Sequence, residues 1–352
     1  MRGNKRWMGV GFMLLLTVCL AGGGCGKGTQ DGMDDGRGGS EAVSDREEGG
    51  ASEGRRKGDG DSGVLREPTD AGGISEPTDV DRISKPTAAG GIPEPTAVSL
   101  ICEQGETLEE RFLVPDGYGR KKREQDTLTA FLREYPLKKA GKPVLLYDGS
   151  RKGNQSAHAA VFKLPIENED LQQCADSIMR VYAEYFWQTK QFEKISFSLG
   201  GGFQADYSKW RQGYTISVSG DTAQWVPSSS SDGSYRSLKK YLRLVFAYSG
   251  TATMEGETKK IAREDIRVGD VFLKGGSPGH VVMVVDVCER REDGAKAFLL
   301  GQGYMPAQEF HVLKNPRHEE DPWYYEEEVE YPFETPEYTF ARGSLRRLRY
   351  DE

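Results

Sequence analysis

The stretch GDVFLKGGSPGHVVMVVDV, residues 269–287, decides the fold of this chain. It contains two apolar runs, 269–273 and 280–287, which flank a turn with three glycines and a proline (275–279). Short β-branched or aromatic runs bounded by glycine and proline are typical of neighbouring β-strands. The turn places His280 at the first position of the second run. This is an unusual position for an imidazole, unless its ring nitrogens find partners.

The flanking sequence extends the same pattern. Residues 296–302 and 309–313 predict two more strands of an antiparallel meander, with a hairpin turn at 292–294. Upstream, apolar residues at helical spacing predict helices, and short apolar runs predict strands. The expected helices are 122–134, 170–187 with Asp170 as its N-cap, and 234–247, and the further strands are 143–149, 157–165 and 337–341. Helices followed by a meander predict an α+β fold.

Residues 1–25 are predicted to be an export signal. Three basic residues precede the apolar run 10–20, which is too short for an ordinary membrane span. Small residues lead directly into Cys25, as in bacterial lipoprotein signals, so Cys25 is the predicted lipidation site. The alternative is a plain secretory peptide with Cys25 as a free thiol. The favoured interpretation places the protein outside the cytoplasm, on the cell membrane through a lipid anchor.

Residues 26–99 predict a disordered linker. The segment has no aromatic residue or further cysteine, and a nine-residue Pro-Thr unit repeats within it. The remaining residues, 100–352, hold almost all the aromatic residues and predict one globular domain. The formal net charge of −8 and the absence of a basic stripe argue against a nucleic-acid partner.

Cys174 is the first candidate for chemistry. It lies in the opening turn of the predicted helix 170–187, where free N–H groups favour a thiolate. The same residue also lies on the apolar stripe of that helix, where a small buried cysteine needs no function. His280 supplies a possible imidazole partner, because a thiol hydrolase needs a base from another element. The alternative is that His280 only caps its strand.

The segment GDVFLKGGSPGHVVMVVDV resembles the pattern of NlpC-type and CHAP-type cell-wall cysteine peptidases, which are papain-like. The resemblance implies a helix packed on an antiparallel sheet, with Cys174 as nucleophile and His280 as base. Gln302, on the following predicted strand, is the first choice to orient His280, and Asp286 is the second. The chain departs from the pattern in its long Cys-to-His spacing and in the QQCADS setting of the cysteine.

A broader resemblance is to DUF4846, an uncharacterised bacterial family. The segments QCADSIMRVYAEY, YLRLVFAYSGT, VGDVFLKGGSPGHVVMVVD and LLGQGYMPAQEFHVLKNP carry it, and together they span most of residues 105–350. This resemblance implies no activity, but it places the cysteine and histidine segments in one domain.

Trp210, Tyr214 and Trp225 are candidate substrate-binding residues, because flat rings stack on sugars and peptides. Such a cluster is more often core. The histidines show no metal spacing with the cysteines, so we predict neither a metal nor a cofactor.

The leading hypothesis is a membrane-anchored thiol hydrolase or amidase that acts on cell-envelope material such as peptidoglycan. The rival is a non-catalytic binding or structural lipoprotein on the same scaffold.

Overall fold

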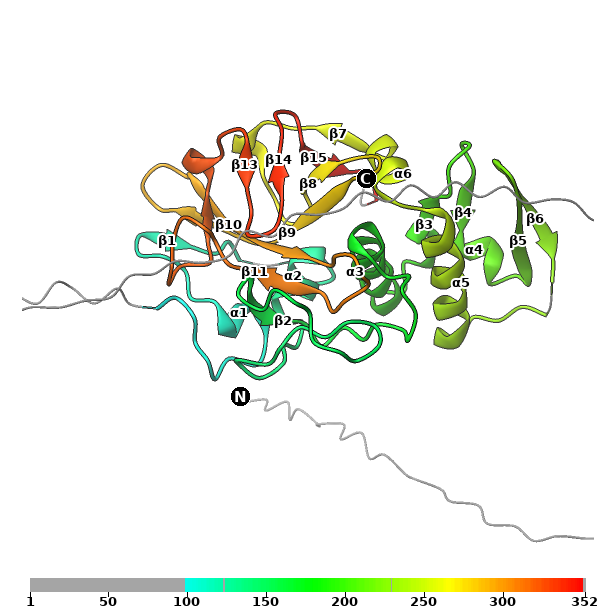
Figure 1. Cartoon of the computed structure of the whole chain (residues 1–352), viewed down its shortest axis with the longest axis horizontal. Coiled ribbons are helices and arrows are strands. Elements are labelled where there is room, and N and C mark those ends of the chain that lie inside the picture. The colour runs from blue at the N-terminus through cyan, green and yellow to red at the C-terminus, as the bar shows by residue number, and fades with distance from the viewer. Residues whose placement is uncertain (1–98, 123, 229, 351–352) are drawn as a thin grey trace, which may run out of the picture. The chain divides into compact units, whose positions relative to one another are not determined.

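A nine-stranded sheet forms the centre of the computed structural model, which describes residues 99–122, 124–228 and 230–350 (Figure 1). The main path runs β2-β11-β10-β9-β8-β15-β7, with β1 paired to β9 and β12 paired to β10, all antiparallel. The strands are β1 (Tyr118–Gly119), β2 (His158–Val161), β7 (Thr258–Lys260), β8 (Val271–Lys274), β9 (His280–Arg290), β10 (Lys296–Gln302), β11 (His311–Leu313), β12 (Tyr324–Tyr325) and β15 (Leu345–Leu348). Helices combined with a large antiparallel sheet confirm the predicted α+β class. The predicted signal segment, Cys25 and the linker up to residue 98 lie outside the described residues.

Strand β9 is the central strand of the core. Its residues from Val281 to Val285 have no exposed surface. Val281, Met283 and Val285 face one apolar cluster, and Val282 and Val284 face a second cluster on the opposite side of the sheet. A strand buried on both faces has an apolar residue at every position, which explains the continuous run in the sequence.

The turn between β8 and β9 is tightly packed against its surroundings. Lys274 and His280 pair across the two strands at its base. A Cβ atom on Gly279 would lie 2.3 Å from the Thr251 hydroxyl and 2.8 Å from the Lys274 carbonyl. Only glycine fits there, so the turn fixes where β9 begins and where His280 lies.

Helix α3 (Cys174–Gln188) packs on one face of the sheet, and almost all of its residues are buried. Its Tyr182 hydroxyl donates to the Gly269 carbonyl at 3.3 Å. Figure 1 shows α3 beside β9 and β10, with α4, α5 and the β5–β6 hairpin beyond it. The helix begins at Cys174, with Gln173 as its N-cap, and not at Asp170 as predicted. The Asp170 carboxylate instead accepts from the Ala307 backbone N–H at 2.6 Å.

Smaller elements complete the domain. The helices are α1 (Leu108–Arg111), α2 (Leu128–Arg133), α4 (Tyr207–Trp210), α5 (Tyr235–Tyr248) and α6 (Thr251–Gly256), with 3-10 turns η1 (Phe192–Lys194), η2 (Arg263–Asp265) and η3 (Glu326–Glu328). Three two-stranded sheets pair β3 (Ser196–Ser198) with β4 (Gln204–Asp206), β5 (Tyr214–Ser219) with β6 (Thr222–Pro227), and β13 (Phe333–Glu334) with β14 (Thr339–Phe340). The predicted helix 234–247 is confirmed as α5, capped by Ser234.

Three predicted elements differ from the structure. Helix 122–134 is shortened to α2, because the Thr127 hydroxyl accepts from the Ala130 N–H and caps the helix there. The predicted strand 143–149 forms only isolated bridges, such as the pairing of Leu145 with Arg151. The predicted strand 337–341 is reduced to the two residues of β14.

Candidate active site at the start of helix α3

Cys174 occupies the first position of α3 and is 6 % exposed. The backbone N–H groups of Ala175, Cys174 and Val281 lower the pKa of its thiol and so favour the thiolate. Burial outweighs them, and with the nearby Asp176 carboxylate it raises the pKa of Cys174 to about 11. The sequence suggested a thiol activated by the helix start. The structure shows a protonated thiol at neutral pH, because desolvation exceeds the effect of the helix terminus.

His280 begins β9 and is 3 % exposed. Its Nε2 atom lies 2.8 Å from Gln302 Oε1. The ring packs against Tyr304 and Tyr338, with centroid distances of 4.6 and 4.9 Å. Burial lowers the pKa of His280 to about 4, and the Lys152 charge contributes in the same direction. The imidazole is therefore neutral at neutral pH and can accept a proton.

Gln302 ends β10 and is fully buried. Its Oε1 contacts His280, and its Nε2 donates to Glu337 Oε2 at 2.7 Å. Asp286, the second choice to orient His280, lies six residues further along β9, where Arg120 and Arg133 each bind its carboxylate at 2.7 Å. The structure therefore pairs His280 with Gln302 and assigns Asp286 to a buried ion cluster.

The sulfur and the imidazole face opposite sides of the sheet. Cys174 belongs to the apolar cluster that Val281 faces, whereas the His280 ring packs on Tyr338 and Phe340 at the other cluster. The Val281 backbone N–H, which lowers the pKa of Cys174, belongs to the residue directly after His280. Within the described part of the chain, no hydrogen bond joins the sulfur to the His280 ring.

A cavity of about 540 Å³ gives access to the thiol. It is bounded by the start of α3, by the end of α5 with the start of α6, and by the glycine-rich turn before His280. Its lining includes Cys174, Asp176, Thr251, Gly279 and Met305, and no lysine or arginine. Met305 is half exposed. Neither His280 nor Gln302 is among the residues that line it.

The aromatic residues proposed for substrate binding lie elsewhere on the domain. The Trp210 indole N–H donates to Ser237 at 3.0 Å, and its ring packs on the core. Tyr214 and Trp225 flank Lys209, whose Nζ lies 5.2 and 5.4 Å from the two ring centroids. None of the three aromatic residues lines the cavity at Cys174. The geometry shows a packed aromatic group around a lysine, and a substrate role for it stays a prediction.

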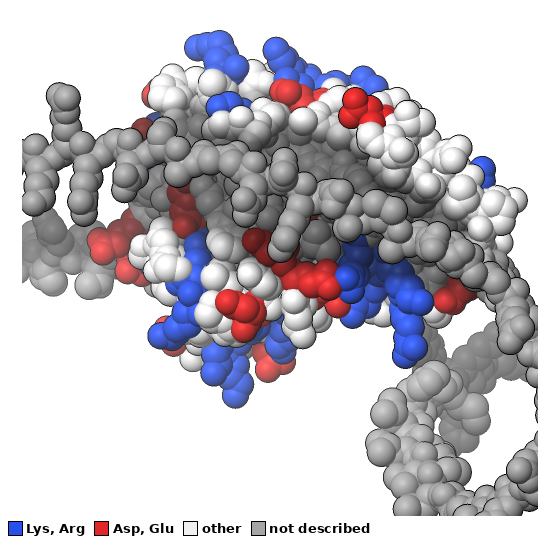
Figure 2. Space-filling model, turned by 45° about the vertical axis from the view of Figure 1, so that its right-hand side comes forward, with Lys and Arg blue, Asp and Glu red and all other residues white. Residues whose placement is uncertain are grey.

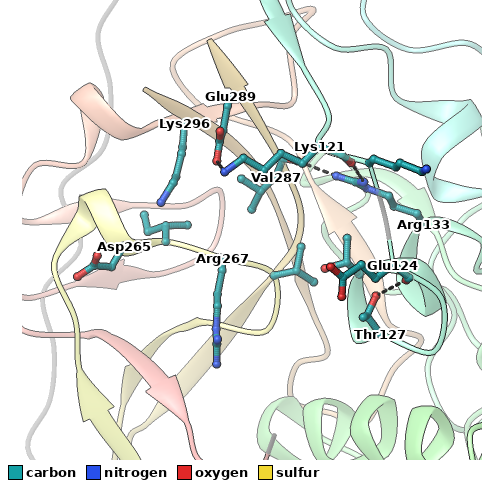
Figure 3. A pocket seen from close by; sticks show the side chains of 13 residues that line it. Lys121, Glu124, Thr127, Arg133, Asp265, Arg267, Val287, Glu289 and Lys296 are labelled. Atoms are coloured by element: carbon teal, nitrogen blue, oxygen red, sulfur yellow. Dashed lines mark hydrogen bonds and ion pairs between the residues drawn. The ribbon is translucent and has the colours of Figure 1, made fainter. Parts of the chain in front are cut away.

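A second cavity, of about 390 Å³, lies at the opposite end of β9 and β10 (Figure 3). Lys121, Arg133, Arg267 and Lys296 line it, together with three acidic residues. Several of these cations are engaged: Lys121 pairs with Glu289 at 2.7 Å, and Arg133 with Asp286. Figure 2 likewise shows acidic and basic side chains interspersed on the visible described surface.

Sequence reasoning missed three residues of the buried network. Lys152 and Glu337 form an ion pair behind Gln302, and His311 Nε2 lies 3.3 Å from Gln302 Nε2. No local sequence pattern marks any of the three residues. Among the described residues, no group of three or more His, Cys, Asp or Glu side chains is placed to hold a metal ion.

The fold and the site define an α+β domain with a cysteine at a helix start and a histidine at a strand start. A family model described as "Domain of unknown function (4846)" matches residues 108–347, so the chain belongs to the DUF4846 family. No curated protein and no solved structure matches the chain. Within the described ranges, no helix is both long and apolar enough to cross a membrane.

Proposed function

We propose that this domain is a papain-like thiol hydrolase or amidase. The observation that carries the proposal is the 2.8 Å contact between His280 Nε2 and Gln302 Oε1, which provides an oriented imidazole in a domain that also has a cysteine at a helix start. Thiol hydrolases need three groups: a nucleophile, a base that takes its proton, and a group that orients the base. In this proposal they are the helix-start cysteine, the strand-start histidine and the glutamine on the next strand. The cavity at Cys174 supplies the route for the substrate.

In this mechanism the proton moves only when the sulfur attacks. With the pKa of Cys174 at about 11 and that of His280 at about 4, both groups are neutral at rest. His280 takes the thiol proton as the sulfur bonds to the carbonyl carbon. Backbone N–H groups at the start of α3 stabilise the oxyanion. The imidazolium then protonates the leaving amine as the C–N bond breaks, and water, activated by His280, hydrolyses the thioester.

We place the substrate in the cell envelope, with peptidoglycan peptides as the leading class. Support comes from the sequence, in which the basic and apolar start of the chain and Cys25 indicate a lipid-anchored, extracytoplasmic protein. If residues 26–99 form the linker that their composition predicts, its root-mean-square span would be roughly 45–50 Å, enough to let the domain search the nearby envelope.

The second candidate is a non-catalytic binding or structural lipoprotein. The observation that favours it is the burial of both groups, with no hydrogen bond from the Cys174 sulfur to the His280 ring. On this alternative the two residues pack the core, and the cavity at Cys174 holds a ligand without reaction.

Activity against purified envelope fragments tests the proposal, with the full chain compared with its Cys174→Ser variant. The matched control is Cys288→Ser, which changes another buried thiol outside the site. We expect product release from the parent and from Cys288→Ser, and none from Cys174→Ser. Equal release by all three would contradict Cys174 as the nucleophile. Release by none, while the parent binds the fragments, would favour the binding lipoprotein.

Alkylation mapped by peptide mass spectrometry gives a second test. Cys174 and Cys288 are both buried, but only Cys174 lines the cavity. We expect Cys174 to react faster than Cys288 near neutral pH, and His280→Ala to slow that reaction. Equal rates for the two thiols would argue against activation of Cys174.

A further inference from the structure

A buried chain of polar side chains runs behind His280, from Gln302 to Glu337, His311 and Lys152. Gln302, His311 and Lys152 are buried, and the Glu337 side chain is 11 % exposed. Each of these side chains has a defined capacity to donate or accept hydrogen bonds. The protonation of His311 and the carboxylate of Glu337 therefore determine the direction of the other hydrogen bonds.

His311 is the starting point. Its Nδ1 lies 2.8 Å from the Glu309 carbonyl oxygen, which can only accept, so Nδ1 carries the proton. Burial and the Lys152 charge hold the pKa of His311 well below its usual range, so the ring is neutral. Its Nε2 is therefore an acceptor, and it faces the amide nitrogen of Gln302 at 3.3 Å and Lys152 Nζ at 3.4 Å.

Glu337 is the second fixed point. Its carboxylate can only accept, and it receives the Lys152 ammonium and the Gln302 amide N–H, the latter at 2.7 Å. Asn154 donates to its other oxygen at 3.2 Å. The two N–H groups of Gln302 thus have two acceptors, Glu337 and His311.

These two acceptors determine which end of the Gln302 amide faces His280. With its NH₂ group engaged on Glu337 and His311, the Oε1 atom faces His280 Nε2 at 2.8 Å. A carbonyl oxygen accepts, so His280 Nε2 carries the proton and Nδ1 keeps its lone pair. A reversed amide would bring its oxygen against the Glu337 carboxylate and would place the proton of His280 on Nδ1.

We infer that Glu337, with Lys152 and His311 beside it, is a positioning residue that fixes His280 in the tautomer protonated on Nε2. Nδ1 is then the only proton acceptor that His280 offers to the site. The use of that acceptor on the Cys174 thiol rests on the proposed function, whereas the tautomer itself does not. Glu337 acts through Gln302 and touches neither the sulfur nor the imidazole.

The tautomer is measured directly by nitrogen NMR of the full chain with ¹⁵N-labelled histidine rings. Four histidines are present, and variants of each one assign the signals. We expect His280 to show a protonated Nε2 and a bare Nδ1, and His311 to show the opposite. In Glu337→Ala the ratio of the two His280 tautomers should shift by about tenfold toward Nδ1–H, since a charge-assisted acceptor is lost.

The matched control is Glu334→Ala, which removes an exposed glutamate three residues earlier and should leave the His280 signals unchanged. If Glu337→Ala does not fold, Glu337→Asp replaces it. The shorter side chain draws the carboxylate away from Gln302, and the same shift is expected.

A parent His280 protonated on Nδ1 would overturn the inference, as would an unchanged tautomer ratio in the folded Glu337 variant. Hydrolysis by a parent chain with such an Nδ1–H histidine would overturn the inference and leave the proposed function standing. An Nε2–H histidine that depends on Glu337, in a chain with no hydrolytic activity, would support the inference and contradict the proposed function.

Discussion

Asp176→Asn should stabilise the domain, and more so at alkaline pH. Asp176 is 5 % exposed at the third position of α3, and one of its oxygens, Oδ1, has no hydrogen-bond partner among the described residues. Burial raises its pKa to about 7, from an ordinary value of 3.8, although the Gln173 N–H donates to its other oxygen at 3.0 Å. The folded state therefore binds this proton more tightly than the unfolded state does.

The sign and size follow from proton linkage. Because the folded pKa is the higher one, ionisation of Asp176 destabilises the fold progressively as pH rises from about 4 to about 7. The full cost above this window is about 4 kcal/mol, at 1.36 kcal/mol per pKa unit. Between about pH 5 and about pH 8.5, the advantage of Asp176→Asn over the parent should grow by about 3 kcal/mol. The asparagine carbonyl retains the bond from the Gln173 N–H.

Urea unfolding of the parent and the variant at the two pH values measures this difference. Asp116→Asn, at an exposed aspartate, is the control and should show no such growth. A stability difference that is the same at both pH values would refute the reasoning, because it would mean that Asp176 is ionised without cost. Faster alkylation of Cys174 in Asp176→Asn is a second expected readout, since the Asp176 charge helps to raise the pKa of the thiol.

The remaining predictions concern packing, buried charge and acid stability. Gly303→Ala places a Cβ atom 2.2 Å from the Ser177 hydroxyl, so it should lower the free energy of unfolding by about 1–3 kcal/mol in urea titrations; an unchanged midpoint would contradict the close packing of β10 on α3. Asp286→Ala leaves the buried Arg133 without its carboxylate and should cost about 3–5 kcal/mol by the same measurement. Because the pKa of His280 is lower in the folded state, its contribution to stability is complete above about pH 6.5 and is lost as pH falls toward about 4. His280→Gln should therefore reduce the loss of stability in acid, measured by urea unfolding across this pH range. An acid profile identical to that of the parent would argue against a buried neutral imidazole.

The sheet and the pairing of His280 with Gln302 were accessible from sequence because both depend on local patterns. A glycine-rich turn set the start of β9, and an apolar run ending at residue 302 set the end of the neighbouring strand. Antiparallel neighbours in a meander bring such ends together. The resemblance to cell-wall peptidases added the expected role of Gln302.

The rest depended on contacts that no local pattern encodes. Glu337 and Lys152 meet across 185 residues of sequence, and neither lies in a strand of the central sheet. The protonation state of Cys174 depends on how deeply it is buried, which the helix-start position does not reveal. Trp210 illustrates the same point, because its indole is engaged by Ser237, on a different helix.

The wide spread of the site along the chain has a consequence during synthesis. The site draws on five residues that lie far apart in the sequence: Lys152, Cys174, His280, Gln302 and Glu337. A ribosome-bound chain that has not yet reached residue 337 therefore holds Cys174 without the Glu337 carboxylate that binds Gln302. Under the proposed function, thiol chemistry would begin only after residues 152–337 have been synthesised and folded together.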